Sequence, residues 1–135
     1  MTEHNNYPAN PEFPAPEVAY ADAPGVVSEI GWVAQQARTL PLDQETSREY
    51  WLRKAALVDR IALARAVTHP QEEALDAAEM ASNAAVQLIE YDERQADGDE
   101  RPAAGSIRFS DALICAGYRA YVRQQYLAWN RAQQS

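Results

Sequence analysis

The chain has 135 residues and a formal net charge of −8 at pH 7, from 20 acidic and 12 basic side chains. This length fits one domain with its own core. The acidic balance argues against binding to nucleic acid, which needs a net basic face, and no apolar run approaches the roughly 18 residues of a membrane helix. The polar, proline-rich start lacks the apolar segment of a secretory signal. We therefore expect a soluble cytoplasmic protein with neither a nucleic-acid nor a membrane partner.

The first 25 residues contain five of the eight prolines, and each proline fixes φ and removes a backbone donor. Branched aliphatic side chains are also scarce there. We therefore predict that residues 1–25 are a disordered acidic tail with no regular element, and that deleting residues 1–22 leaves the melting temperature nearly unchanged. Its candidate docking residues are Phe13 and Tyr20. They either dock onto another protein, lie across the chain's own domain or remain solvated.

Two helices are predicted next along the chain. Apolar residues recur at spacings of three and four over residues 26–39, which indicates a short amphipathic helix that ends before a proline. A long helix is predicted over residues 46–67, because Thr46 and Glu49 match the S/T-x-x-E capping box with Thr46 as the N-cap. Glu49 also precedes Arg53 by one turn, which is the favourable order for an ion pair. Apolar side chains fill a wide face of this second helix.

A break before Pro70 separates that helix from a third one, predicted over residues 70–94. Proline is tolerated in a first helical turn, and the acidic residues that follow it suit the helix dipole. Many alanines permit close packing, so we expect this helix to be central. A loop is predicted at residues 97–106, and Ser110 is the predicted N-cap of a last helix over residues 111–132.

These elements predict an all-α fold, a small irregular bundle of three long helices and one short helix over residues 26–135. Charge varies along it. Residues 48–67 and 101–135 each carry five basic side chains and few acidic ones, whereas residues 68–100 carry ten acidic and one basic. We expect the two basic helices to pack beside the acidic one, through ion pairs that contribute about 0.5 kcal/mol each.

The last predicted helix carries a candidate interaction face. Aromatic residues at helical spacing usually form a core, but tyrosine and tryptophan also anchor interfaces. The face is therefore either core or a contact with a protein partner or a second copy. Its arginines most simply neutralise the acidic third helix, and the alternative is stacking with single-stranded nucleic acid. The members of the face are Tyr118, Val122, Tyr126, Trp129, Arg119 and Arg123.

Acidic residues of the third helix form the strongest catalytic pattern. They resemble in part the paired acidic motifs by which all-α nucleotide pyrophosphohydrolases hold magnesium; the pattern consists of Glu72, Glu73 and Asp76, followed by Glu90 and Glu93. On one unbroken helix, Asp76 and Glu90 lie about 21 Å apart, which is too far to share an ion. A shared site therefore requires a helix break near Ser82 and Asn83, or a symmetry-related copy.

Other catalytic patterns are absent from the sequence. Cys115 lies in an apolar run and is expected to be a buried, inert thiol, and His69 is a lone imidazole at a helix junction. There is no nucleophile elbow, phosphate loop or zinc motif. We therefore predict no catalytic residue, no cofactor and no metal.

The function predicted by elimination is that of a non-catalytic protein-protein interaction or regulatory protein. An arginine-rich composition with one lysine, Lys54, is typical of GC-rich bacterial genomes, so we expect a bacterial cytoplasm. One alternative is a DNA-associated accessory protein of a plasmid or phage. Another is a small all-α metal-dependent nucleotide hydrolase.

Overall fold

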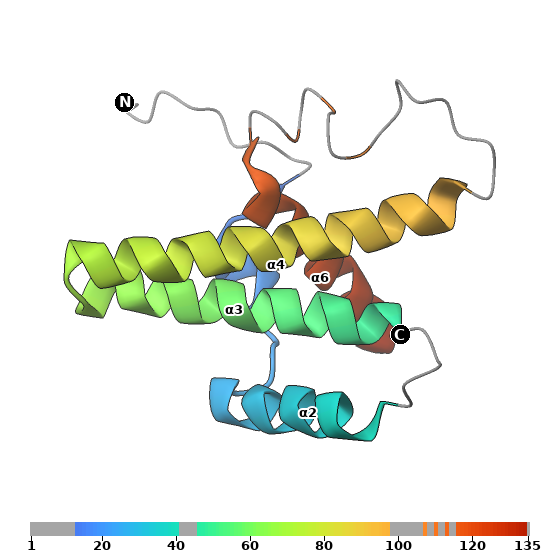
Figure 1. Cartoon of the computed structure of the whole chain (residues 1–135), viewed down its shortest axis with the longest axis horizontal. Helices are drawn as coiled ribbons and strands as arrows, with labels where there is room; N and C mark the ends of the chain where they lie inside the picture. The colour runs from blue at the N-terminus through green and yellow to red at the C-terminus, as the bar shows by residue number, and fades with distance from the viewer. Residues whose placement is uncertain are drawn as a thin grey trace.

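The structure is a computed structural model that describes residues 13–40, 46–97, 107, 110, 113 and 116–134 (Figure 1). Every extended regular element in these residues is a helix. The prediction of an all-α bundle with three long helices and one short helix is confirmed, and one further turn precedes them. The helices are α1 (Pro16–Ala19), α2 (Val26–Thr39), α3 (Arg48–Thr68), α4 (Gln71–Asp97) and α6 (Tyr118–Gln134).

The centre of the bundle is a long antiparallel hairpin of α3 and α4 (Figure 1). His69 and Pro70 connect the two helices. The His69 N–H donates to the Arg65 carbonyl at 3.0 Å, and the Pro70 carbonyl accepts from the Ala74 N–H at 3.0 Å. Small side chains on both helices let their axes approach closely. The buried alanines of the hairpin are Ala55, Ala56, Ala62, Ala77, Ala81, Ala84 and Ala85.

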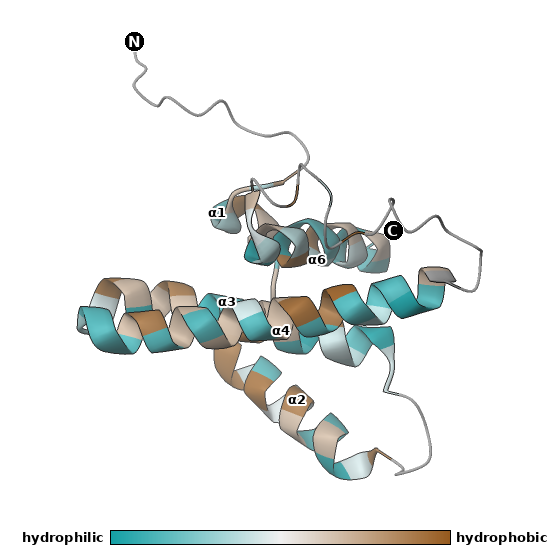
Figure 2. Cartoon of the chain, turned by 45° about the horizontal axis from the view of Figure 1, so that its top comes forward, coloured by the Kyte–Doolittle hydropathy of each residue, from teal (hydrophilic) through white to brown (hydrophobic). Residues whose placement is uncertain are grey.

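Two groups of helices pack on different sides of this hairpin. α6 contacts both α3 and α4, and α1 contacts α6, whereas α2 contacts α3. In Figure 2, α1 and α6 therefore appear above the hairpin and α2 below it. The largest fully buried apolar side chains join α3, α4 and α6 into one core: Leu52, Leu88, Ile89, Leu113, Val122 and Tyr126.

The start of α3 differs by one residue from the predicted capping box. The N-cap is Ser47, whose Oγ accepts from the Tyr50 N–H at 3.3 Å, so the assignment of this role to Thr46 was wrong. Glu49 does not complete a capping box on Thr46 and instead accepts from Arg53 at 2.7 Å. The predicted ion pair one turn apart is therefore confirmed.

The predicted continuous helix over residues 111–132 is wrong, because Gly117 interrupts it. Its φ of 92° lies in the left-handed region that glycine adopts without steric cost. Ser110 does act as the predicted cap, accepting from the Leu113 N–H at 3.2 Å. The Gly117 N–H then closes this turn on the Leu113 carbonyl at 2.7 Å, and α6 begins at the next residue.

The described part of the predicted tail packs on the bundle. Pro16 lies in the first turn of α1, where its missing N–H costs nothing, so the prediction of no regular element before residue 26 is wrong there. Phe13 and Tyr20 pack against the core, and the Tyr20 ring meets the Tyr126 ring edge-on at 5.4 Å. Residues 1–12 lie outside the described residues. Both candidate docking residues thus lie across the chain's own domain.

Candidate functional site

Three carboxylates lie in the interior, one on each of α2, α3 and α4. Glu29 is 2% exposed and Asp59 is 0% exposed, and the Asp92 side chain is 11% exposed. Buried carboxylates are rare unless they are paired. Each of these three binds an arginine from another helix, so the polar interior is the first candidate for a functional site.

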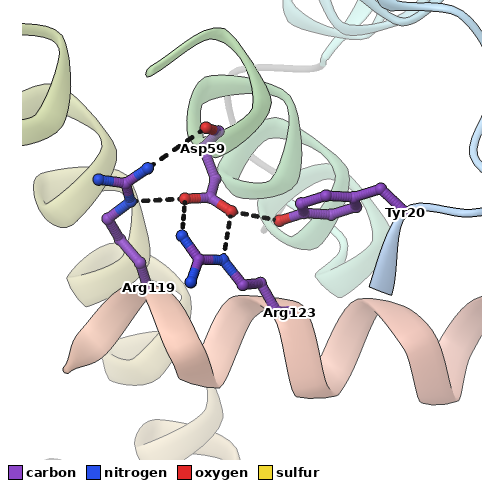
Figure 3. A network of polar contacts seen from close by, with 4 residues as sticks. All are labelled: Tyr20, Asp59, Arg119 and Arg123. Atoms are coloured by element: carbon purple, nitrogen blue, oxygen red, sulfur yellow. Dashed lines mark hydrogen bonds and ion pairs between the residues drawn. The ribbon is translucent and has the colours of Figure 1, made fainter. Parts of the chain in front are cut away.

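Asp59 lies between Tyr20 and two arginines of α6 (Figure 3). Its Oδ1 accepts from Arg119 Nε at 2.5 Å and from Arg123 Nη2 at 3.0 Å. Its Oδ2 accepts from Arg123 Nε at 2.9 Å and from the Tyr20 hydroxyl at 2.6 Å. A carboxylate offers about four acceptor positions. All four are therefore occupied by groups of this chain.

The environment of this cluster keeps Asp59 ionised and Tyr20 neutral. Burial favours the neutral form of Asp59, but hydrogen bonds from Arg123 and Tyr20, together with the arginine charge, outweigh it and lower the pKa of Asp59. Burial, and then the neighbouring Asp59 charge, raise the pKa of Tyr20 far above its usual value. Tyr20 thus remains a neutral donor and Asp59 an ion, which leaves no group here that exchanges protons near neutral pH.

Asp92 of α4 joins α3 and α6 in the same way. Arg48 donates from Nε and Nη2 to its two oxygens at 2.7 and 2.9 Å, a bidentate pair. The Tyr121 hydroxyl donates to Oδ2 at 2.5 Å. Burial, followed by this hydrogen bond, raises the pKa of Tyr121. Arg48 also donates to Gln125 at 2.9 Å, so this cluster too is satisfied from within.

Glu29 anchors α2 to α3. Arg53 donates to its two oxygens at 3.0 and 2.6 Å. The Arg53 guanidinium also lies 3.7 Å from the centre of the Trp32 ring and 5.5 Å from that of the Trp129 ring. Such cation–π contacts add to the ion pair. One arginine therefore links α2, α3 and α6.

The predicted interaction face of the last helix is largely internal. Val122 and Tyr126 are fully buried in the core of this chain, so of the two alternatives, core and contact with a partner, core packing applies to these two residues. Tyr118 and Trp129 are half-buried against the same core. Burial raises the pKa of Tyr126, whose hydroxyl makes no hydrogen bond within the described part of the chain.

Arg119 and Arg123 also have a different partner from the one predicted. They bind Asp59 of α3, not the acidic helix α4. Sequence reasoning missed Asp59 and Glu29 as structural groups. A signal was present, because Asp59 interrupts the apolar stripe of its helix four residues after Ala55 and three before Ala62. An acid at such a position predicts a buried partner.

Within one chain, the acidic residues of α4 do not gather at a single site. α4 runs unbroken through Ser82 and Asn83, where a break was needed to bring Asp76 and Glu90 together. Within the described ranges, no three His, Cys, Asp or Glu side chains gather to hold an ion. His69 is exposed and contacts Thr68, and Cys115 lies outside the described residues.

Besides Val18, Val67 and Leu75, apolar side chains are open to solvent on a face of α2 and on a face of the hairpin. On α2, Val27 is 83% and Ile30 46% exposed. On the hairpin, Met80 is 61% exposed beside hollows lined only by residues of α3 and α4. Among the helices of the described residues, none combines the length and apolar character needed to span a bilayer. These two surfaces are the candidate interaction sites.

The fold and the contacts define a small all-α bundle. Its interior ion clusters join the helices to one another, and its exposed candidate sites are apolar helix faces. Comparison with protein-family models, with curated proteins and with solved structures finds no match to this chain. The proposals below therefore rest on the geometry of the chain itself.

Proposed function

We propose that this chain is a non-catalytic protein-binding module of a bacterial cytoplasm, and that α2 carries its binding face. One observation carries the proposal: the one buried side chain of α2 is a carboxylate, while its aliphatic residues Val27 and Ile30 face solvent. Glu29 is 2% exposed, against 83% for Val27. This reverses the usual order, in which aliphatic residues are inside and acids outside.

The exposed stripe of α2 also indicates the chemistry of its partner. Val27, Ile30, Ala34 and Ala37 follow one another at spacings of three and four, so they share one face of the helix. None of them is charged, in a chain with 24% charged residues. An uncharged aliphatic helix face of another protein matches this surface, because apolar groups on both sides lose water together.

The mode of attachment of α2 supports the same role. α2 contacts α3, and Glu29 and Trp32 hold it there through Arg53. Since polar and aromatic contacts secure the helix, the exposed side chains of Val27 and Ile30 are not needed to hold it in place. They are available to a partner without rearrangement of the bundle.

The two alternatives have less support. A DNA-associated role relied on Arg119 and Arg123, which are engaged with Asp59. A metal-dependent hydrolase relied on Asp76 and Glu90, which one continuous helix keeps apart. No contact in the described residues favours either role.

The test compares two variants that add the same charge to the same helical turn. V27D places a carboxylate on the exposed stripe, whereas S28D places it on another exposed face of α2. Neither removes a buried group. Proteins retained by the tagged wild-type chain in its host are identified, purified and titrated against all three forms. We expect V27D to bind at least about 30-fold more weakly, because a charge replaces a valine that the bound partner covers.

S28D is expected to bind like the wild type. Circular dichroism and thermal melting establish that both variants are folded. Equal affinities of V27D and the wild type for the purified partner would refute the assignment of the binding face to α2.

A further inference from the structure

The face of the α3–α4 hairpin that α6 leaves uncovered carries a second apolar surface. Two hollows, of about 260 and 160 Å³, lie side by side along it and share Val58 and Met80 as walls. All of their lining residues belong to α3 or α4. The two helices run next to each other there (Figure 1), so the hollows form one groove along the hairpin.

Each helix contributes one regular stripe to this groove. The α3 stripe is Lys54, Val58, Ile61 and Arg65, at spacings of four, three and four. The α4 stripe is Ala77, Met80, Ala84 and Gln87, at spacings of three, four and three. Such spacings keep side chains on one helix face. The groove is thus apolar in its middle and polar toward its ends, which suits helix packing.

Charges of opposite sign lie on the two sides of the groove. Arg65 and Lys54 stand on the α3 side. On the α4 side, Glu73 and Asp76 continue the stripe of Met80 toward the hairpin turn, seven and four residues before it. Arg65, Glu73 and Asp76 are exposed, and in the described part of the chain they form no ion pair. One side is therefore basic and the other acidic.

We propose that this face binds a second copy of the chain, so that two hairpins pack face to face as a four-helix bundle. In a twofold pair the same patch serves both partners, and it must complement itself. A twofold axis along the groove places α3 of each copy over α4 of the other, at the same height. The basic side of each groove then meets the acidic side of its mate.

The heights of the charged residues fit this arrangement. Arg65 and Ala77 line the same hollow, and each is the residue of its helix in that hollow that comes nearest to the hairpin turn, so they lie at the same end of the groove. Asp76 is the neighbour of Ala77 along α4. The twofold operation therefore brings Arg65 of each copy toward Asp76 of the other, which makes two equivalent ion pairs. A uniformly acidic or uniformly basic partner matches only one side of the groove.

The size of the face is sufficient for a dimer. α3 has 21 residues, which corresponds to about 30 Å of helix, and two helices side by side are about 20 Å wide. Their common face therefore measures about 600 Å² in projection. Stable interfaces bury about 800 Å² of accessible surface on each partner. Side chains make the face uneven, so its accessible surface is larger than its projected area and reaches this size. No residue of α2 lines the two hollows, so dimerisation and partner binding are tested with different variants.

The experiment measures mass by sedimentation equilibrium of the full chain between about 1 and 100 µM. We expect a reversible dimer, at twice the chain mass of 15.0 kDa. The single variants R65E and D76R each convert two attractive contacts into repulsive ones. Each is expected to weaken dimerisation about 30-fold. The double variant R65E/D76R exchanges the charges and is expected to restore it to within about threefold.

R38E is the matched control, because Arg38 is an exposed arginine of α2 outside the groove; it should dimerise like the wild type. Circular dichroism checks that each variant is folded. A wild-type chain that is monomeric at every concentration overturns the proposal. An R65E chain whose dimer affinity equals that of the wild type also overturns it. If R65E/D76R dimerises no better than the single variants, the pairing of Arg65 with Asp76 is refuted. None of these results depends on partner binding by α2.

Discussion

Replacing Asp59 with asparagine tests whether the central ion cluster stabilises the bundle. The substitution keeps the shape of the side chain but removes its charge and one of the two oxygens that accept from Tyr20, Arg119 and Arg123. Two arginines then lie close together with no counterion. Breaking a buried pair on one side costs about 3 to 5 kcal/mol. Since the arginine side chains are 22% and 17% exposed, solvent screening places the loss near the lower end, at about 3 kcal/mol.

The measurement is urea denaturation of D59N and the wild type at pH 7, followed by circular dichroism. A loss of about 3 kcal/mol corresponds to a melting temperature about 10 °C lower for a chain of this size. D22N is the matched control, because Asp22 is exposed, and it should change stability by less than about 0.5 kcal/mol. A D59N loss below about 1 kcal/mol would mean that the cluster does not stabilise the fold.

The same variant carries a pH dependence whose sign follows from the lowered pKa of Asp59. A carboxyl with a lower pKa in the folded state binds fewer protons there than when unfolded, where its pKa is about 3.9. Its contribution to stability is complete well above that value and is lost progressively as the pH falls below it and through the lower pKa of the folded state. The stability difference between the wild type and D59N should therefore be constant from pH 7 to about 5 and shrink below about pH 4. A difference that grows on acidification contradicts this assignment.

Two further predictions concern the tyrosines and the N-terminal segment. Tyr20 and Tyr121 have raised pKa values, so they remain protonated in the folded chain, whereas in the unfolded chain they ionise near pH 10. The free energy of unfolding, measured by urea titration, should therefore fall above about pH 10. It should fall less steeply in the variant Y20F/Y121F. Deleting residues 1–22 removes α1 and the hydrogen bond from Tyr20 to Asp59, and should lower the melting temperature by about 10 to 15 °C. Deleting residues 1–12, which spares these contacts, is its control, and equal melting temperatures of the two deletions would contradict the structural role of α1.

Local patterns in the sequence were sufficient to place most helices. The spacing of apolar residues located α2 at Val26–Thr39, and the break before Pro70 separated α3 from α4. Such predictions were correct because the helical repeat and the backbone restrictions of proline depend only on residues that are close together in the sequence. Gly117 is also a local signal, but its φ of 92° depends on where the chain must turn. The interruption was therefore missed.

The ion clusters could not be predicted in the same way. Counting charges by segment suggested that Arg119 and Arg123 neutralise α4, whereas both bind Asp59, 60 and 64 residues away in the chain. Net charge is a property of a whole segment. A hydrogen bond instead depends on which individual side chains of two packed helices face each other at the same level of the bundle. Tyr20, assigned to the tail, was missed for the same reason, since its bond to Asp59 spans 39 residues.

The three buried carboxylates solve a problem that an alanine-rich bundle creates. A seam of small side chains such as Ala77, Ala81 and Ala84 fits several registers with similar burial, because each methyl group resembles the next. A bidentate arginine and carboxylate meet in one register only. The pair of Asp92 with Arg48 therefore fixes the register of α4 against α3. The pairs of Asp59 with Arg119 and Arg123 fix α6 against the hairpin.

The pair formed by Glu29 has a different consequence. It secures α2 through charge and through the stacking of Trp32 on Arg53, so burial of Val27 and Ile30 is not required to hold that helix. Val27 and Ile30 can then remain in solvent without loss of the fold. The buried acid thus explains why an apolar stripe is exposed on α2, and it links the packing of the interior to the proposed binding of a partner.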